Sequence, residues 1–232
     1  MKILVINPGS TSTKIAVYEN DTPRLVRNIR HTVDELSSFS HIIDQFEFRK
    51  NLVLKELEAD NIPFEFDAIV GRGGLLKPIP GGVYEVNDAM LDDILHAMRT
   101  HACNLGCLIA SELAALLPGC RAFIADPGVV DELDEIARIT GSPLMPRITI
   151  WHALNQRAIA RRYAAAQHVR YEDLDLIVCH LGGGISVGVH HHGKAVDVNN
   201  ALDGEGPFSP ERAGTLPAGQ LIDLCCSGRY TK

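Results

Sequence analysis

The sequence lacks long apolar runs, clusters of basic residues and paired-cysteine motifs. No stretch approaches the roughly 18 consecutive apolar residues of a membrane-spanning helix, and the apolar run at residues 3–6 is too short for a signal peptide. The longest basic run is Arg161-Arg162, and 22 basic against 29 acidic residues give a formal net charge of −7. We therefore expect a soluble, cytoplasmic protein with neither nucleic acid nor membrane among its partners.

The cysteines and a histidine cluster give no clear metal site. The six cysteines lie in apolar contexts without Cys-x-x-Cys spacing, which predicts buried free thiols, with a disulfide or a zinc site as the alternative. They are Cys103, Cys107, Cys120, Cys179, Cys225 and Cys226. His190 to His192 precede Gly193 in an expected hairpin, and neighbouring strand residues point to opposite faces. We therefore predict a solvated turn there rather than a metal site.

What the sequence does contain is a polar turn at residues 7–14, Asn-Pro-Gly-Ser-Thr-Ser-Thr-Lys. It follows an apolar run and precedes an alternating one, so it is predicted to join two strands. Backbone N–H groups, hydroxyls and Lys14 together suit a phosphate chain. The spacing of a Walker loop is absent and no helix pattern follows. A polar hairpin turn without a ligand is the alternative.

The remaining pattern alternates strands and helices over a chain of 232 residues, enough for one large or two modest domains. We predict strands at 24–30, 66–71 and 121–125, and helices from 34 or 38 to 58, and at 87–99, 105–117, 130–139 and 151–166. Asn87 is expected to cap the helix at 87–99. The helix at 151–166 is interpreted as a bridge to a second unit, with Arg157, Arg161 and Arg162 on a charged face.

The second unit begins like the first, which indicates an internal duplication. Strands are predicted at 174–179, 185–190 and 194–199, followed by a long loop and a helix near 220–226, and Gly182 occupies the position of Gly9. This divides the chain into domains at 1–150 and 151–232. If the halves are of similar size, the later elements of the second would lie beyond residue 232, so we expect a C-terminally truncated chain.

Two matched turns could grip a triphosphate from both sides. Phosphoryl transfer requires mainly positioning and charge stabilisation. In the second turn, Gly182 to Gly184 lets the backbone approach phosphate without an intervening Cβ. A dinucleotide fingerprint fails because Val187 stands where a glycine is needed. The pair of turns therefore favours a nucleotide-phosphate site.

Three stretches, at residues 5–14, 179–187 and 196–214, resemble butyrate kinases, which belong to the acetate kinase family within the superfamily of acetate and sugar kinases and actin. The resemblance runs through essentially all 232 residues. It implies an α/β fold, the duplicated ribonuclease H-like (actin-like ATPase) fold, with an incomplete second half. It further implies a transferase that phosphorylates butyrate or another short-chain fatty acid reversibly, using ATP and Mg²⁺, usually toward ATP synthesis in fermentation, and a homo-oligomer at full length.

The resemblance also assigns residues. The first phosphate motif falls on Asn7, Ser10, Ser12 and Lys14, and the second on His180, Gly182, Gly183 and Gly184. Catalytic roles fall on Arg72, His101, Asp126, His152 and Arg212, and a magnesium site on Asn7 and Asp126. The substrate pocket is assigned to Gly73, Gly74 and Trp151. The family's adenosine-binding segment and a late glutamate would follow Lys232, so we expect this chain to bind adenine poorly and to be inactive alone.

Physical arguments support several of these roles independently. A guanidinium offers a planar, permanently charged fork to carboxylate or phosphate. Arg72 lies between glycines at a strand end, a position that a surface ion pair explains poorly. Arg212 lies in a Gly/Pro loop that is too long for a simple connection. Structural alternatives remain for two others: His152 as a helix-start residue and Asp126 as a turn residue.

Substrate preference can be predicted from the residues after Arg72. Acetate kinases have bulky aliphatic residues there, whereas this chain has Gly73 and Gly74. Removing side chains would deepen the acyl pocket, and each further buried methylene contributes about 0.8 kcal/mol. We therefore expect four-carbon and branched acids to be preferred over acetate. The alternatives are an acetate or propionate kinase, or a non-catalytic nucleotide-binding protein of the same fold.

Overall fold

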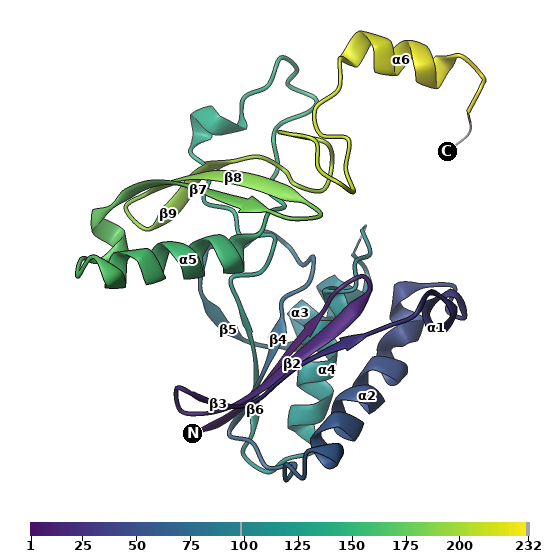
Figure 1. Cartoon of the computed structure of the whole chain (residues 1–232). Coiled ribbons are helices and arrows are strands. Elements are labelled where there is room, and N and C mark those ends of the chain that lie inside the picture. The colour runs from purple at the N-terminus through teal and green to yellow at the C-terminus, as the bar shows by residue number, and fades with distance from the viewer. Residues whose placement is uncertain (98, 231–232) are drawn as a thin grey trace. The chain divides into compact units, whose positions relative to one another are not determined.

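The computed structural model describes residues 1–97 and 99–230, and the chain divides into two units, Met1–Val129 and Val130–Lys232 (Figure 1). The division falls before residue 150, where the sequence placed the domain boundary. Met98, inside the helix expected at 87–99, and residues 231–232 of the second domain lie outside the described residues.

Unit 1 contains a six-stranded mixed sheet in the order β3-β2-β1-β4-β6-β5. Its strands are β1 (Lys2–Pro8), β2 (Ser12–Glu19), β3 (Thr22–Arg30), β4 (Ala68–Arg72), β5 (Val83–Glu85) and β6 (Arg121–Ala125). The first three form an antiparallel meander, and β4 and β6 run parallel to β1. The carboxyl ends of β1, β4 and β6 therefore share one edge of the sheet, the edge where ligands bind in many α/β proteins.

The helical elements of unit 1 are α1 (Val33–Ser37), the 3-10 turn η1 (Ile42–Gln45), α2 (Phe46–Ala59), α3 (Asp88–Leu95) and α4 (Asn104–Ala115). The single helix expected up to residue 58 is wrong. The hydroxyls of Ser37 and Ser38 donate to the carbonyls of Asp34 and Glu35, at 3.0 and 2.8 Å, and such bonds compete with helix continuation. Asn87 caps α3 as predicted, but the helix ends at Leu95.

Helices α2 and α4 run along the sheet of unit 1 and bury its main core (Figure 1). The core includes Leu4, Ile6, Ile15 and Val17 from the strands, Val53 and Leu57 from α2, and Leu105, Ile109 and Leu113 from α4. Gly71 of β4 and Gly106 of α4 make the closest approach: a Cβ on Gly71 would overlap the Gly106 carbonyl. This contact brings the first turn of α4 against the end of β4.

Unit 2 contains η2 (Glu135–Arg138), α5 (Ala153–Ala166), η3 (Tyr171–Asp173) and α6 (Ala218–Cys226). Its antiparallel sheet has the order β7 (Asp175–Leu181), β8 (Ile185–His191), β9 (Lys194–Val198). Ala160 and Ala164 of α5 pack with Tyr171 against β7, so α5 belongs to unit 2 rather than bridging to it. The helix expected at 130–139 is reduced to η2.

Several side chains differ in burial from the sequence-based expectation. Arg157, expected on a charged outer face of α5, is buried and pairs with Glu132 at 2.8 Å. All six cysteines are free, but Cys179, Cys225 and Cys226 are exposed rather than buried. His190, expected in a solvated turn, is fully buried in β8. Among the described residues, no group of His, Cys, Asp and Glu is arranged to hold a metal.

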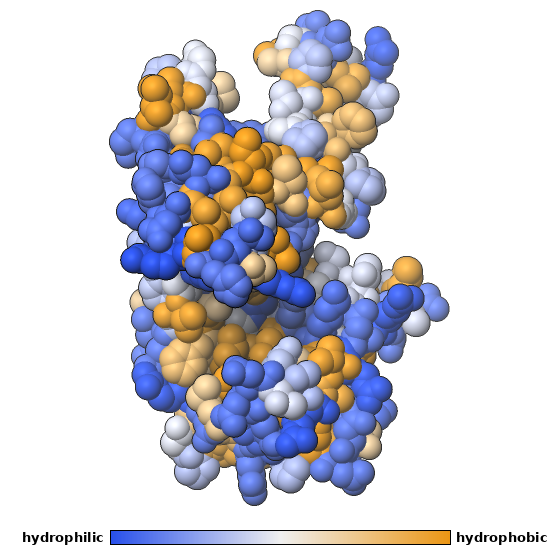
Figure 2. Space-filling view, turned by 60° about the vertical axis from the view of Figure 1, so that its left-hand side comes forward, coloured by the Kyte–Doolittle hydropathy of each residue, from blue (hydrophilic) through white to orange (hydrophobic). Residues whose placement is uncertain are grey.

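The surface is mostly hydrophilic with scattered apolar areas, as Figure 2 shows for one face of the molecule. Large apolar side chains are exposed on β7 and β8, namely Ile177, Leu181 and Val189. Within residues 1–97 and 99–230, no helix has both the length and the apolar character required to cross a membrane.

Candidate active site

The polar turn between β1 and β2 is shorter than predicted, because both strands extend into it. Gly9 N donates to Ser12 O at 2.7 Å, which closes a turn around residues 9–11. Asn7 and Lys14 face each other in the strand ladder instead of lying in the turn. Ser10 is exposed, and Ser12 is half-buried at the start of β2.

A buried arginine that sequence reasoning missed supports this turn from behind. Arg49 of α2 is fully buried, and its Nη1 donates to Thr13 Oγ1 at 2.9 Å and to Ser12 O at 3.2 Å. Nε and Nη2 donate to Gln45 Oε1 at 3.0 and 2.9 Å, and burial lowers the pKa of Arg49 to about 10. No carboxylate in the described part of the chain forms an ion pair with it. The guanidinium therefore places positive charge directly beneath the turn.

Arg72 ends β4 beside the end of β1. Its Nη1 lies 3.4 Å from Asn7 Oδ1, and the side chain is half-buried. Ser10 Oγ lies 3.5 Å from His101 Nε2. Four residues predicted for the site, two from the phosphate motif and two from the catalytic set, therefore meet at one edge of the sheet in unit 1.

Asp126 follows β6 at the same edge. Its side chain is 4% exposed, its Oδ1 accepts from Gly82 N at 2.9 Å, and its backbone N donates to Gly82 O at 2.8 Å. The carboxylate of Asp126 and the amide oxygen of Asn7 are ligand types that Mg²⁺ prefers. Both residues lie at the carboxyl edge of the parallel strands, where Asn7 Oδ1 accepts from Arg72 and Asp126 Oδ1 accepts from Gly82, so the fit to the predicted ion is one of ligand type.

The geometry does not support the argument that Gly73 and Gly74 deepen an acyl pocket. A Cβ on Gly73 would lie 2.6 Å from Pro127 Cβ, and one on Gly74 would lie 2.8 Å from Asn104 Cα. Neighbouring atoms of unit 1 already fill the space that the missing side chains leave. The two glycines instead allow the loop to pack tightly, and Leu75 N then donates to Asn104 Oδ1 at 2.9 Å.

In unit 2, two predicted histidines stack on each other. His152 precedes α5 as its N-cap, and its ring lies 3.7 Å from that of His180, centroid to centroid, at an interplanar angle of 5°. Ser186 Oγ lies 2.9 Å from His152 Nδ1, and Asn155 Nδ2 lies 2.9 Å from His180 Nδ1. These two polar partners hold the stacked rings in place.

Arg212 approaches the same histidine pair because of Gly184. A Cβ on Gly184 would overlap Arg212 Nη1 and lie 3.2 Å from His152 Cε1, so a larger residue would require the guanidinium to shift. At Gly183, a Cβ would lie 2.7 Å from a carboxylate oxygen of Glu211. The Gly183–Gly184 part of the predicted phosphate turn therefore adjoins the loop that carries Arg212. At Gly182, a Cβ would lie 3.3 Å from His180 Nε2 and 3.6 Å from Gly184 O, with no overlap.

Trp151 is a core residue of unit 2. It is 3% exposed, packs with Val130 and Leu133, and donates from Nε1 to Val130 O at 2.7 Å. Within unit 2 the indole packs in the core, so only the resemblance supports its assignment to the substrate pocket.

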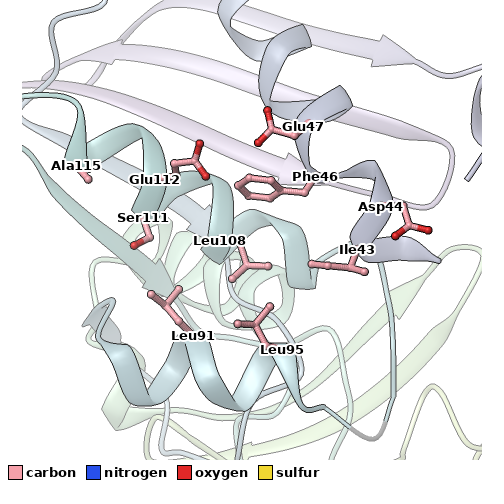
Figure 3. Close-up of a pocket in the computed structure, with 10 residues that line it drawn as sticks. All are labelled: Ile43, Asp44, Phe46, Glu47, Leu91, Leu95, Leu108, Ser111, Glu112 and Ala115. Carbon is pink, nitrogen blue, oxygen red and sulfur yellow. The ribbon is translucent and has the colours of Figure 1, made fainter.

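Unit 1 also contains an apolar pocket of about 550 Å³, which none of these residues lines (Figure 3). Phe46 of α2, Leu91 and Leu95 of α3, and Leu108 of α4 point into it, with Glu47 and Glu112 at its rim. Because none of the predicted site residues lines this pocket, it is not part of the candidate active site.

Comparison with known proteins places the chain among named kinases, although no protein-family model matches it. It is 79% identical over 232 residues to "Probable butyrate kinase" of Bacteroides thetaiotaomicron, covering all of this chain and 66% of that protein. It is 55% identical over 233 residues to "Butyrate kinase 2" of Clostridium acetobutylicum, covering 65% of that protein. The chain thus spans just under two thirds of the length of these relatives.

Solved structures share the fold at low sequence identity. An acetate kinase from Porphyromonas gingivalis superposes with a TM-score of 0.67 at 20% identity, over 99% of this chain and 65% of that one. A propionate kinase from Francisella tularensis gives a TM-score of 0.69 at 15% identity, over 99% and 65% of the two chains. The expected actin-like ATPase fold is therefore confirmed.

Proposed function

Because this chain belongs to the butyrate kinase family, we propose that it carries the phosphate- and carboxylate-binding residues of a kinase for butyrate and similar short-chain acids. The proposed reaction transfers the γ-phosphoryl group of ATP to a carboxylate. A carboxylate oxygen forms the new P–O bond, the bond between the γ-phosphorus and the bridging oxygen breaks, and ADP leaves. No base is required, because the acid is already ionised at pH 7.

The observation that carries the proposal is the meeting of Arg72 and Asn7 beside the polar turn in unit 1. The turn at residues 9–12 would hold phosphate oxygens through its N–H groups and hydroxyls. Arg72 would hold the carboxylate, the acyl phosphate, or both in succession, because its fork can pair with either oxyanion. A nucleotide-binding protein without an acyl acceptor has no need of this arginine.

In unit 2, His152 and Arg212 would stabilise charge that develops on the transferring phosphoryl group. Donors that are already oriented cost no reorganisation when the reaction occurs. The stack on His180 and the fit of Arg212 against Gly184 supply that orientation. In unit 1, Asp126 and Asn7 would hold Mg²⁺, and the ion would supply positive charge for the phosphate oxygens.

The test is a hydroxylamine trap for acyl phosphate, run with MgATP and each of acetate, propionate, butyrate and isobutyrate on the longest product of the gene. Arg72→Lys should reduce kcat/KM by about a thousandfold, since a catalytic arginine contributes about three to five orders of magnitude. The matched control is Arg24→Lys, in which an exposed arginine paired with Glu19 is changed. If the protein binds ATP but forms acyl phosphate from none of the acids, the non-catalytic alternative is favoured. If acetate has the highest kcat/KM of the four acids, an acetate kinase is favoured.

A further inference from the structure

Four buried side chains of unit 2 form a hydrogen-bonded chain that ends at His152. Tyr171 is 4% exposed, and His190, Gln156 and Ser186 are fully buried. The bonds run from Tyr171 Oη to His190 Nδ1 (2.5 Å), from His190 Nε2 to Gln156 Oε1 (2.9 Å), from Gln156 Nε2 to Ser186 Oγ (2.8 Å) and from Ser186 Oγ to His152 Nδ1 (2.9 Å). We call these four residues the relay.

The direction of the bonds made by Gln156 follows from one backbone carbonyl. Ser186 O can only accept, and Gln156 approaches it at 2.9 Å, so the group facing it is the amide nitrogen. The amide oxygen of Gln156 therefore faces His190 Nε2, which must donate. Burial lowers the pKa of His190 to about 4, so this ring is neutral at pH 7 and its Nδ1 carries no hydrogen. The Tyr171 hydroxyl consequently donates to Nδ1.

At the other end, the same amide orients the serine. One hydrogen of Gln156 Nε2 is directed at Ser186 O and the other at Ser186 Oγ. Because that hydroxyl oxygen accepts from the amide, its own hydrogen is available for His152 Nδ1 at 2.9 Å. A neutral imidazole that accepts at Nδ1 carries its hydrogen on Nε2.

We propose that the relay fixes His152 as the Nε2–H tautomer, so that this nitrogen donates to the transferring phosphoryl group. The role of the donor rests on the proposed function, in which His152 stabilises phosphoryl charge. Phosphate oxygens only accept hydrogen bonds, so a ring with its hydrogen on Nδ1 would present a lone pair and repel them. Ser186, Gln156 and His190 are thus positioning residues, which act through His152.

Strand β8 is built to accommodate the relay. Ser186, Gly188 and His190 are alternate residues of the strand, so they share one face. A Cβ on Gly188 would lie 2.6 Å from Gln156 Oε1 and 3.2 Å from His190 Nε2. The glycine therefore leaves room for the bond between the glutamine and the histidine, and Gly188→Ala would displace that bond without removing any polar group.

The test is nitrogen NMR of the chain labelled with ¹⁵N-histidine, which reports the tautomer and hydrogen bonding of each ring without substrate. The His152 signals are identified by their loss in His152→Gln. In the wild type, His152 and His190 should both be neutral with hydrogen on Nε2. Ser186→Ala and Gly188→Ala should each shift the His152 Nδ1 signal away from its hydrogen-bonded position. Ser227→Ala, at the C-cap of α6, is the control and should leave it unchanged.

Hydrogen on Nδ1 of either wild-type ring would overturn the proposal, and the tautomers themselves are read from the wild-type chain. The proposal would also be overturned if the His152 signal shifted in Ser186→Ala but not in Gly188→Ala. In that case Ser186 alone would orient His152, without the rest of the relay. The kinase proposal has its own test. If the tautomers are those proposed here but no acid yields acyl phosphate, the relay stands and the kinase proposal fails.

Discussion

The imidazole rings of His152 and His180 stack with their centroids 3.7 Å apart and their planes 5° apart. The two residues come from different elements, the N-cap of α5 and strand β7, and each ring has its own polar partner, Ser186 or Asn155. The stack thus joins the start of a helix to the predicted second phosphate turn. In addition to the proposed contact with phosphate, His180 therefore supports the ring of His152.

Replacing His180 should separate these roles. His180→Phe keeps an aromatic ring against His152, whereas His180→Ala removes it. We expect both variants to weaken binding of inorganic tripolyphosphate by about tenfold, the usual effect of losing one hydrogen bond to a charged group. Only His180→Ala should also lower kcat, measured by the hydroxylamine trap. Equal kcat values in the two variants would show that the stack does not orient His152.

Arg49 should contribute to phosphate binding although it is buried. Arg49→Met removes the cation beneath the turn and the bond to Ser12 O, so we expect affinity for tripolyphosphate to fall by about tenfold. Lys50→Met is the control, because it also removes one positive charge from α2. The Lys50 side chain pairs with Glu47 and Glu112 rather than with the turn. Isothermal titration calorimetry measures both. An equal loss in the two variants would mean that only net charge matters.

The stability of unit 2 should depend on pH through His190. Its pKa is lowered from 6.5 to about 4 by burial, so between these values the unfolded state binds a proton that the folded state excludes. Stability is therefore full above pH 6.5 and falls as the pH decreases toward 4, by about 3 kcal/mol in total. Fluorescence of Trp151, the single tryptophan, reports unfolding in urea at each pH.

The matched variants for this pH dependence are His190→Gln and His192→Gln. The first should remove most of the slope of unfolding free energy between pH 4 and 6.5, whereas the second changes an exposed neighbour and should preserve it. A slope that persists in His190→Gln would assign the pH dependence to other groups.

The buried ion pair between Arg157 and Glu132 should be sensitive to loss of one partner. Their side chains are 7% and 9% exposed, and Glu132 also accepts from Ala195 N at 3.0 Å. Glu132→Ala removes a buried carboxylate that pairs with Arg157, so we expect the unfolding free energy of unit 2 to fall by about 3–5 kcal/mol. Glu135→Ala, in a side chain that is 94% exposed, should have little effect in the same urea titration. Similar losses in both variants would contradict the prediction.

The contact between Gly71 and Gly106 should not tolerate a methyl group. Gly71→Ala would force α4 away from β4, with an expected loss of about 3 kcal/mol in unfolding free energy and displacement of Arg72. Gly82→Ala is the control in unit 1, because its Cβ would make an ordinary contact of 3.4 Å with the Tyr84 ring. Circular dichroism during thermal unfolding compares them. A normal melting temperature in Gly71→Ala would show that the helix can shift freely.

Elements with a regular apolar period were predictable from sequence. The strand at 121–125 matches β6, the helix expected at 151–166 is α5 with its start at His152, and the three strands of unit 2 differ from expectation by only a few residues at their ends. Periodicity is a local property, so it survives in the fold. The break between α1 and α2 was missed, because serine hydroxyls can either project into solvent or bond to the preceding turn.

The burial of polar residues was not predictable in the same way. Arg49, Arg157 and His190 occur in stretches that look solvated, yet each is buried because a partner distant in sequence supplies its hydrogen bonds. The sequence predicted open space beside Gly73 and Gly74, but atoms of Pro127 and Asn104 occupy it.

By itself, the sequence indicated the resemblance to butyrate kinases, and that resemblance implied the actin-like ATPase fold and the polar groups of the candidate site, because a resemblance depends only on the identity and order of residues. The tertiary structure decided how those groups are held. It placed Arg49 beneath the polar turn, Arg72 beside Asn7, and the relay behind His152. The physical reason is that the direction of a hydrogen bond and the burial of a charge are set by neighbours in space, which may lie far apart along the chain.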